Sequence, residues 1–303
     1  MPQHITFLTS TLGMGGAERH VELVVGALTS RGVDVDVVCV EEGGPRADRL
    51  RAHGVQVLEL DAGDRWWMRA PVVVRRTAGR LRADGTSLVM TNGYSAEIVG
   101  RLAGRVAGVP VVRWKHNIGH VGRFGLRDRW TERLLRPLGG RVLAVSRTQV
   151  EYLTGWLGIP GESIGCVRNV LEGGPGPADP EPPRSPEPVV VCVAGFRAEK
   201  DHPTLLRAFA SVLTAHPNAR LRLVGDGPER AAAEALAREL DLAHAVESLG
   251  DRSDIDLLLR DASVFALASF AVENLPFAVL EAMGTGLPVV ATDVGALGEL
   301  VED

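Results

Sequence analysis

The chain has 303 residues, of which 45% are hydrophobic and 23% are charged, with a formal net charge of -5. This length suits two domains of ordinary size, and no apolar run approaches the ~18 residues that indicate a membrane span. The start, Met-Pro-Gln-His-Ile-Thr, lacks the basic segment and apolar core of a signal peptide, so we expect a cytoplasmic protein.

The charge is divided unevenly between the two halves of the chain. Residues 1–172 hold 23 Lys and Arg against 17 Asp and Glu, whereas residues 173–303 hold 10 against 21. Either the halves are two solvated surfaces, or the first half meets something anionic. The acidic total and the lack of an aromatic-basic recognition motif argue against nucleic acid as a partner.

The first half alternates short β-branched runs with helix-like stretches. The pattern predicts strands at residues 5–10, 33–40, 55–60, 87–91, 109–114, 141–145 and 163–167. It predicts helices between them, including 17–31, 94–107 and 127–138. Strands that alternate with helices at this spacing indicate a parallel sheet covered on both faces.

A glycine-rich turn with Gly15 and Gly16 follows the first predicted strand and opens the first predicted helix. Glycine lets the backbone approach a ligand closely, and the N–H groups at a helix start favour an anion. A nicotinamide dinucleotide fingerprint would need glycine where this chain has Glu18, which weakens that interpretation. The turn is either a contact for phosphate or sugar, or simply a tight turn.

Residues 172–188 form the clearest break in composition, with seven prolines. Proline fits neither a helix interior nor a central strand, so this stretch reads as an extended linker. We therefore predict a first domain at residues 1–172, a proline-rich linker at 173–188 and a second domain at 189–303.

The same alternation returns after the linker. It predicts strands at residues 189–194, 220–224, 246–249, 263–267 and 288–292, with helices that include 202–216, 228–240 and 277–285. Two such α/β units would enclose a cleft, and ligands would bind there at the carboxyl ends of the strands.

Arg197 and Lys200 lie in the loop after the strand at 189–194, where ligands usually bind in such sheets. Fixed cations at this point would stabilise the negative charge that develops on a diphosphate leaving group. The alternative is that both side chains are solvated and bind nothing.

The segment 273–277 leads into a predicted helix that carries Glu281. Pro276 suits the first turn of a helix, so Glu273 would precede the helix and Glu281 would lie inside it. A carboxylate that accepts from two hydroxyls suits a sugar or ribose diol. The pair also fits the acid and base of a hydrolase, or an unrelated loop and surface glutamate, and spacing does not separate these.

Cys39, Cys166 and Cys192 lie among Val or Gly in strand-like segments, which favours buried reduced thiols over disulfides or a metal site. Two Asp-x-Asp pairs, at 34–36 and 254–256, resemble metal-binding motifs. The first falls in a strand and the second at a helix start, so we interpret both as structural and expect neither a bound metal nor a cofactor.

The run Glu273-Asn-Leu-Pro-x4-Glu281-Ala-Met-x-x-Gly286-x-Pro288-Val-Val-Ala-Thr-Asp-Val-Gly295 resembles the hallmark of family 4 glycosyltransferases. Further matches follow the order of the chain, at Gly15-Gly16-Ala17-Glu18, His116-Asn117, Asn169, Lys200-Asp201-His202 and Leu223-Val-Gly225-Asp-Gly227. The resemblance covers residues 4–303. Because that family has the GT-B architecture, it implies an α/β fold of two Rossmann-like doubly wound parallel-sheet domains facing a cleft.

The resemblance implies retaining transfer of a sugar from a nucleotide-diphosphate sugar to a carbohydrate or lipid-linked acceptor, without a metal ion. Retention in this family is ascribed to front-face attack assisted by the leaving phosphate, so no protein nucleophile is needed. Nucleotide-sugar epimerases and phosphorylases share the architecture, and an inactive sugar-nucleotide-binding fragment would keep the same motifs. These remain the alternative functions.

Site residues follow from the same resemblance. It places Glu281 on the ribose hydroxyls, Glu273 against the transferred sugar and His116 near that sugar, with His116, Glu273 and Lys200 as the catalytic residues. The remaining donor contacts are Lys200 with Arg197 on the diphosphate, Gly15 and Gly16 on the phosphates, and the backbone of Asn274, Leu275, Pro276 and Phe277 on sugar and phosphates.

The chain departs from the family pattern at three points. Gly195 stands where the family often has arginine, so we expect Arg197 to supply that charge. Val170 stands where glycine commonly follows Asn169, so the first loop of the second domain differs. Relatives continue beyond the position of Asp303 with another strand and helices, so we expect a donor domain that is truncated at its C-terminal end.

Two groups in the first domain combine arginine with tryptophan. They are Arg65, Trp66, Trp67, Met68, Arg69, Arg75, Arg76, Arg80 and Arg82, and then Arg123, Arg127, Arg129, Trp130, Arg133 and Arg136. Such surfaces can rest on anionic lipid, so we hypothesise peripheral contact with the inner face of a membrane. The alternative is buried tryptophans and solvated arginines on amphipathic helices.

Overall fold

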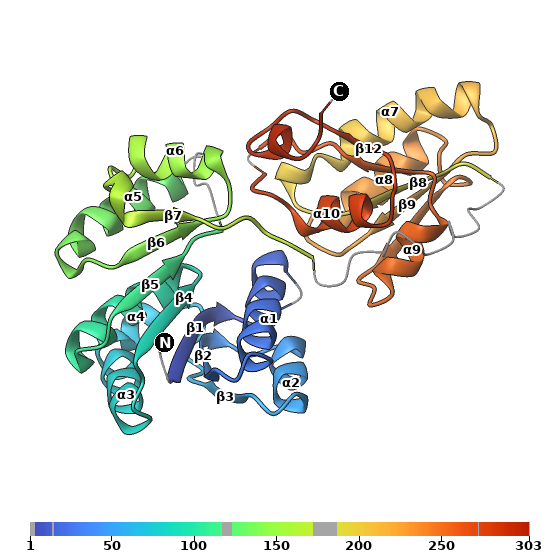
Figure 1. The fold of residues 1–303 in the computed structure, drawn as a ribbon. Helices are drawn as coiled ribbons and strands as arrows, with labels where there is room; N and C mark the ends of the chain where they lie inside the picture. The colour runs from blue at the N-terminus through green and yellow to red at the C-terminus, as the bar shows by residue number, and fades with distance from the viewer. Residues whose placement is uncertain (1–3, 14, 117–122, 172–186, 272, 303) are drawn as a thin grey trace. The chain divides into compact units, whose positions relative to one another are not determined.

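The structure is a computed structural model, and it describes residues 4–13, 15–116, 123–171, 187–271 and 273–302, without the side chains of Arg123 and Phe124. The chain folds as two compact units, Met1–Arg168 and Asn169–Asp303, and each is built on one sheet (Figure 1). Most of the predicted linker at 173–188 lies outside the described residues, so its extended form stays a prediction.

Seven parallel strands form the sheet of the first unit, in the order β3-β2-β1-β4-β5-β6-β7. They are β1 His4–Thr11, β2 Asp34–Glu42, β3 Gln56–Glu59, β4 Leu88–Asn92, β5 Val111–Trp114, β6 Arg141–Ala144 and β7 Ile164–Cys166. Each falls on a strand predicted from a β-branched run. The order changes direction between β1 and β4, which is the doubly wound pattern.

Helices cover both faces of this sheet. They are α1 Gly16–Thr29, α2 Pro45–Ala52, η1 Trp66–Arg69, α3 Ala70–Ala83, α4 Tyr94–Ala107, α5 Arg123–Leu135, η2 Arg136–Leu138, α6 Arg147–Gly155 and η3 Gly161–Ser163. Successive strand residues point to opposite faces, so Phe7 joins the core with α1 and α2 whereas Leu8 joins the core with α3 and α4. Val37 and Val38 of β2 divide in the same way.

A cluster of buried charges joins α4 to β5 and α5. Arg113 Nη1 lies 2.5 Å from Glu132 Oε2 and 3.2 Å from Glu97 Oε1. Arg101 Nη1 lies 2.9 Å from the same oxygen of Glu132, and Lys115 Nζ lies 2.6 Å from Glu97 Oε2. None of these side chains is more than 16% exposed. The charges therefore compensate one another with little help from water, and the cluster fixes both helices against the sheet.

The sheet of the second unit has five parallel strands in the order β10-β9-β8-β11-β12. They are β8 Val189–Val193, β9 Arg220–Val224, β10 Val246–Gly250, β11 Val264–Leu267 and β12 Val289–Ala291, again at the predicted places. The helices are η4 Ala198–Lys200, α7 His202–Ala215, α8 Arg230–Glu239, α9 Ile255–Asp261, α10 Phe277–Gly284 and η5 Leu297–Glu299. One apolar core joins Val191 and Phe265 of the strands to Leu206, Phe209 and Val279 of the helices.

The cysteine prediction is partly wrong. Cys39 and Cys192 are buried and free, as expected, but Cys166 is exposed. Cys166 lies on β7, which is one of the two edge strands of its sheet, so it has a neighbouring strand on one side only.

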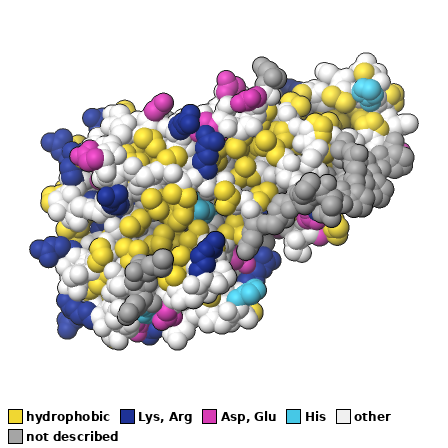
Figure 2. All heavy atoms as spheres, in the orientation of Figure 1, with side chains coloured by type: hydrophobic (Ala, Val, Ile, Leu, Met, Phe, Trp, Pro, Cys, Tyr) yellow, Lys and Arg dark blue, Asp and Glu magenta, His cyan; other side chains and the backbone are white. Residues whose placement is uncertain are grey.

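Within the part of the chain that the structure describes, no helix is both long and apolar enough to cross a membrane. On the face drawn in Figure 2, Lys and Arg side chains are most numerous over the first unit, at the left. The basic excess of the first half of the sequence is therefore visible on this face.

Candidate functional site

Four loops follow strands β8, β9, β11 and β12 and contain most of the residues predicted to bind the donor. The loops comprise residues 194–201, 225–229, 268–276 and 292–296. Because the strands are parallel, these loops lie along one edge of the sheet. Main-chain hydrogen bonds join them, from Phe270 N to Glu199 O at 3.1 Å and from Ala296 N to Glu273 O at 2.8 Å.

Lys200 and Glu273, which are 73 residues apart in the sequence, are in direct contact. Lys200 Nζ lies 2.5 Å from Glu273 Oε1, and the two side chains are 14% and 6% exposed. Ser269 Oγ donates to the same Oε1 at 2.5 Å and is fully buried. Among the described residues both contacts of the carboxylate thus fall on Oε1, which leaves Oε2 as the oxygen that Glu273 can offer to a ligand.

The main chain of Glu273 is held by Gly295. Gly295 has a φ of 62°, and a Cβ at this position would lie 2.2 Å from Glu273 O and 2.7 Å from Glu273 N. Both the backbone conformation and the lack of space therefore require glycine. Sequence reasoning included Gly295 in the family motif without giving it a role. Its role in the structure is to let the loop after β12 pack against the backbone that carries the glutamate.

Replacing Gly295 with alanine is expected to destabilise the second unit by more than ~2 kcal/mol, because the new methyl group overlaps main-chain atoms in a left-handed backbone. Displacement of Glu273 should also reduce activity. The matched control is Gly286→Ala, since Gly286 has a φ of 72° but open space around its Cβ. That variant should lose only ~1–2 kcal/mol. Equal urea midpoints for the two variants, measured by far-UV circular dichroism, would contradict the assigned role.

Two neutral side chains lie in and beneath this loop cluster. Burial raises the pKa of the Cys192 thiol to about 12, so it is not a nucleophile at neutral pH. Burial, and then the charge of Lys200, lowers the pKa of His202 to about 4. The His202 ring stacks on Phe196 at 4.2 Å between centroids, so it serves as a packing residue of the loop after β8.

The segment between Glu273 and α10 has a constrained backbone. Leu275 is buried and has a φ of 49°, which is unusual for a residue other than glycine. Asn169 Nδ2 donates to Leu275 O at 2.8 Å in a buried position, so the first residue of the second unit fixes this loop. Pro276 is the N-cap of α10, one position earlier than the predicted first turn. Asn274 is half-buried and Phe277 is buried.

Glu281 and Arg197, the remaining predicted donor residues of this unit, differ in exposure. Glu281 is half-buried and comes in the second turn of α10, inside the helix as predicted. The Arg197 side chain is 60% exposed and its Nε lies 2.9 Å from Glu199 Oε1. Lys200 is thus the partly buried cation of this loop and Arg197 the solvent-facing one.

The glycine turn of the first unit lies where it was predicted. Gly15 is the N-cap of α1 and Gly16 its first residue, directly after β1. The Glu18 side chain folds back over Gly15 and accepts a hydrogen bond from Thr11 Oγ1 at 2.8 Å. The acidic residue that weakened a dinucleotide motif therefore stabilises the turn itself.

His116 follows β5 in the first unit and packs in an aromatic cluster. Its ring centroid lies 4.4 Å from that of His20 on α1, and the His20 ring meets Trp114 edge-on at 4.2 Å. Burial, and then His20, lowers the pKa of His116 to about 3, so the ring is neutral at physiological pH. His20 is a contact that sequence reasoning missed. Asn117, its partner in the family motif, lies outside the described residues.

Among the residues that the structure describes, no group of three or more His, Cys, Asp or Glu side chains could hold a metal ion. The Asp-x-Asp pairs form other contacts instead. Asp36 Oδ1 lies 3.0 Å from His4 Nε2, and Asp256 Oδ2 lies 2.8 Å from Arg260 Nε.

Comparison with known proteins identifies the family of the chain. The family model described as Glycosyltransferase Family 4 matches residues 14–172, and the one described as Glycosyl transferases group 1 matches residues 178–303. The N-acetyl-alpha-D-glucosaminyl L-malate synthase of Bacillus anthracis is 32% identical over 116 residues, which are 38% of this chain and 30% of that protein. An uncharacterised glycosyltransferase of Methanocaldococcus jannaschii is 24% identical over 95% of this chain and 79% of its own length.

The fold is shared with solved structures. The crystal structure of Anabaena HepE in complex with UDP and glucose superposes with a TM-score of 0.80 at 24% identity, over 100% of this chain and 84% of that one. One assignment follows from three findings. They are the two parallel-sheet α/β units, the match of one family model to more than half of the residues, and these relatives. The chain belongs to glycosyltransferase family 4 and has the GT-B fold.

Proposed function

We propose that this glycosyltransferase transfers a sugar, with retention and without a metal ion, from a nucleotide-diphosphate sugar that its second unit binds. The observation that carries the proposal is the partly buried Lys200–Glu273 pair, 2.5 Å apart, beside the start of the helix that bears Glu281. A cation next to a carboxylate at the carboxyl edge of a parallel sheet suits a ligand that has phosphates and hydroxyls together.

Lys200 is the group that would neutralise the departing diphosphate. An ammonium group has three donors, and among the described residues its contact with Glu273 uses one of them, so two would remain for phosphate oxygens. Arg197, which is exposed, would add charge at the solvent side. A fixed cation stabilises the negative charge that develops as the bond between sugar and phosphate breaks.

Glu273 would bind the transferred sugar, and Glu281 would bind the ribose. The Oε2 atom of Glu273 would accept from a sugar hydroxyl while Lys200 and Ser269 hold Oε1. Asn274, Leu275, Pro276 and Phe277 would supply the backbone that faces sugar and phosphates. From the first unit, Gly15 and Gly16 would approach the phosphates, and the neutral His116 ring would donate or accept one hydrogen bond to the sugar.

The acceptor in this proposal is a carbohydrate or a lipid-linked sugar of the cell envelope. We place the reaction in the cytoplasm, with peripheral contact of the first unit to the inner face of an anionic membrane and without nucleic acid as a partner. The basic first half and the acidic second half of the sequence support this placement.

Thermal shift with uridine, guanosine and adenosine diphosphates tests the donor site. One nucleotide should stabilise the wild-type chain, and Glu281→Ala should weaken its binding roughly 10- to 100-fold, which is the loss expected from a charged hydrogen bond. Glu273→Ala should bind that nucleotide nearly as well but turn over poorly. Glu234→Ala, at a half-buried helical glutamate on α8, is the control. Unchanged nucleotide affinity in Glu281→Ala would remove the ribose role.

Incubation with the donor alone and with acceptor separates the transferase from an epimerase or phosphorylase. The proposal expects no conversion of the donor sugar by itself, and a product whose anomeric configuration matches the donor by NMR. An inverted product would overturn the retaining mechanism while leaving the donor site intact.

A further inference from the structure

Helix α5 of the first unit exposes only two kinds of side chain. Among its described side chains, residues 125–135, the exposed ones are Leu126, Trp130 and Leu134 and the arginines Arg127, Arg129 and Arg133. The three apolar side chains are 54%, 63% and 75% exposed. Large apolar groups this open to water, all on one helix, are unusual on the surface of a soluble domain.

The six residues have a regular arrangement around the helix. Leu126, Trp130 and Leu134 are spaced by four residues, so they form one stripe along the helix. At 100° per residue, Arg129 and Arg133 fall on one side of the stripe and Arg127 on the other. The Arg133 guanidinium lies 5.9 Å from the centre of the Trp130 ring, and that of Arg127 lies 3.8 Å from the Tyr94 ring. The apolar stripe is thus bordered by cations along both sides.

The acidic residues of α5 face inward. Glu132 is buried and accepts from Arg101 and Arg113, and Asp128 is half-buried. The helix therefore carries its negative charge into the domain and presents only positive charge outward. Solvation alone explains neither the open apolar stripe nor this separation of charge.

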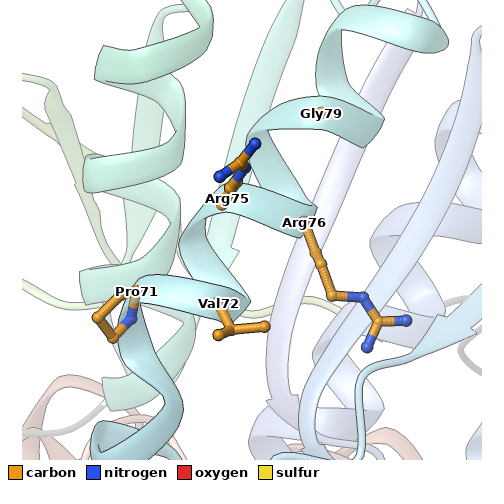
Figure 3. A pocket seen from close by; sticks show the side chains of 5 residues that line it. All are labelled: Pro71, Val72, Arg75, Arg76 and Gly79. Carbon is orange, nitrogen blue, oxygen red and sulfur yellow. The ribbon is translucent and has the colours of Figure 1, made fainter.

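A second basic segment lies in the same part of the unit. Helix α3 packs on α4, and Tyr94 at the start of α4 bonds to Thr131 of α5 at 2.7 Å, so α4 lies between α3 and α5 (Figure 1). Arg75 and Arg76 extend from α3 in different directions beside Val72, at a shallow hollow of about 450 Å³ (Figure 3). Helix α3 has no acidic residue. The segment before it exposes Trp67 and Met68.

We infer that α5 lies in the interface of an anionic lipid bilayer, with Leu126, Trp130 and Leu134 among the acyl chains and the flanking arginines at the lipid phosphates. An amphipathic helix with tryptophan and leucine on one face and arginine at its borders has this mode of binding. A nucleic acid would meet the arginines but leave the apolar stripe against phosphates and water. The inference deepens the proposed membrane contact and rests on it, but it does not depend on the donor site.

Co-sedimentation of the full chain with vesicles tests the assignment. The wild type should bind vesicles of equimolar phosphatidylcholine and phosphatidylglycerol, bind pure phosphatidylcholine at least ~tenfold more weakly, and lose affinity as salt is raised. Trp130→Glu and Leu134→Glu should each lower the partition coefficient on anionic vesicles roughly tenfold. Leu257→Glu makes the same change at a 64% exposed leucine of a helix in the second unit, and it should have no effect.

Several results would overturn the inference. The first is that Leu134→Glu binds anionic vesicles as well as the wild type does, and the second is that Leu257→Glu loses as much binding as the α5 variants. The third is that the wild type binds neutral and anionic vesicles equally. The fourth is that Trp67→Glu loses vesicle binding while the α5 variants keep it. A duplex oligonucleotide that binds the wild type but not Leu134→Glu would assign the surface to nucleic acid instead. The nucleotide thermal shift is measured on each variant. Vesicle binding without a nucleotide thermal shift would contradict the proposed donor site. A nucleotide thermal shift without vesicle binding would contradict only the membrane surface.

Discussion

Replacing Lys200 with methionine is expected to lower the rate of sugar transfer by roughly 10²–10³-fold, because the variant loses the cation that we propose stabilises the departing diphosphate. The Lys200 ammonium lies 2.5 Å from Glu273 Oε1, and both side chains are nearly buried. Removing one member of a buried ion pair leaves the other charge uncompensated, which costs about 3–5 kcal/mol. The second unit should therefore also unfold at lower urea. Initial rates at saturating donor, with unfolding followed by circular dichroism, measure the two effects.

A structural role alone would predict a different pattern in the control variants. Lys200→Met combined with Glu273→Gln removes both charges, so it should regain most of the lost stability but none of the lost rate. Arg197→Met removes an arginine that is 60% exposed and paired with Glu199, so its rate should fall only a few-fold. If the double variant recovered activity together with stability, Lys200 would be a structural partner of Glu273 and no more.

The strands were predictable from the sequence because most of their residues are apolar and many of these are buried in the core. Residues 189–193 form a continuously apolar run on a strand within the sheet, and residues 33–40 are interrupted only by Asp34 and Asp36, so both runs are easy to locate. Helix α3 was not among the helices named from the sequence, because its segment begins with Ala-Pro and three valines, continues with arginines and has no side chain that caps its start. It forms because Val73, Ala78 and Leu81 pack against α4, which is a tertiary contact.

The candidate site shows a similar limit. Motifs located Lys200 and Glu273 separately, but only the fold shows that they touch, since they are 73 residues apart and three strands lie between them. Ser269 and Asn169 bond to the glutamate and to its loop through a hydroxyl and an amide, and such groups have no distinctive sequence pattern. The ring contact between His20 and His116 likewise depends on how α1 crosses the end of β5.

The buried charge cluster of the first unit leads to the other large expected effect, which is a dependence of stability on pH. Burial by itself would raise the pKa of Glu97, but Lys115 and then Arg113 lower it from 4.5 to about 2. A carboxyl whose pKa is depressed on folding stabilises the fold above its unfolded pKa and loses that contribution as pH falls through the folded value. Glu97 should therefore contribute on the order of 3 kcal/mol at neutral pH, and this should disappear between about pH 5 and pH 2.

Replacing Glu97 with glutamine is expected to destabilise the first unit by about 3 kcal/mol at pH 7, because Lys115 and Arg113 then face each other without the carboxylate. All five tryptophans of the chain lie in the first unit, so urea unfolding followed by tryptophan fluorescence reports on this unit alone. The difference from wild type should shrink as the pH is lowered toward 3, since the wild-type carboxylate is then being protonated on unfolding. Glu151→Gln, at an exposed glutamate of α6, should change the free energy of unfolding by less than ~0.5 kcal/mol. A Glu97→Gln difference that stays constant from pH 7 to pH 3 would mean that the variant acts through packing rather than charge, and the cluster would then stabilise the unit by shape alone.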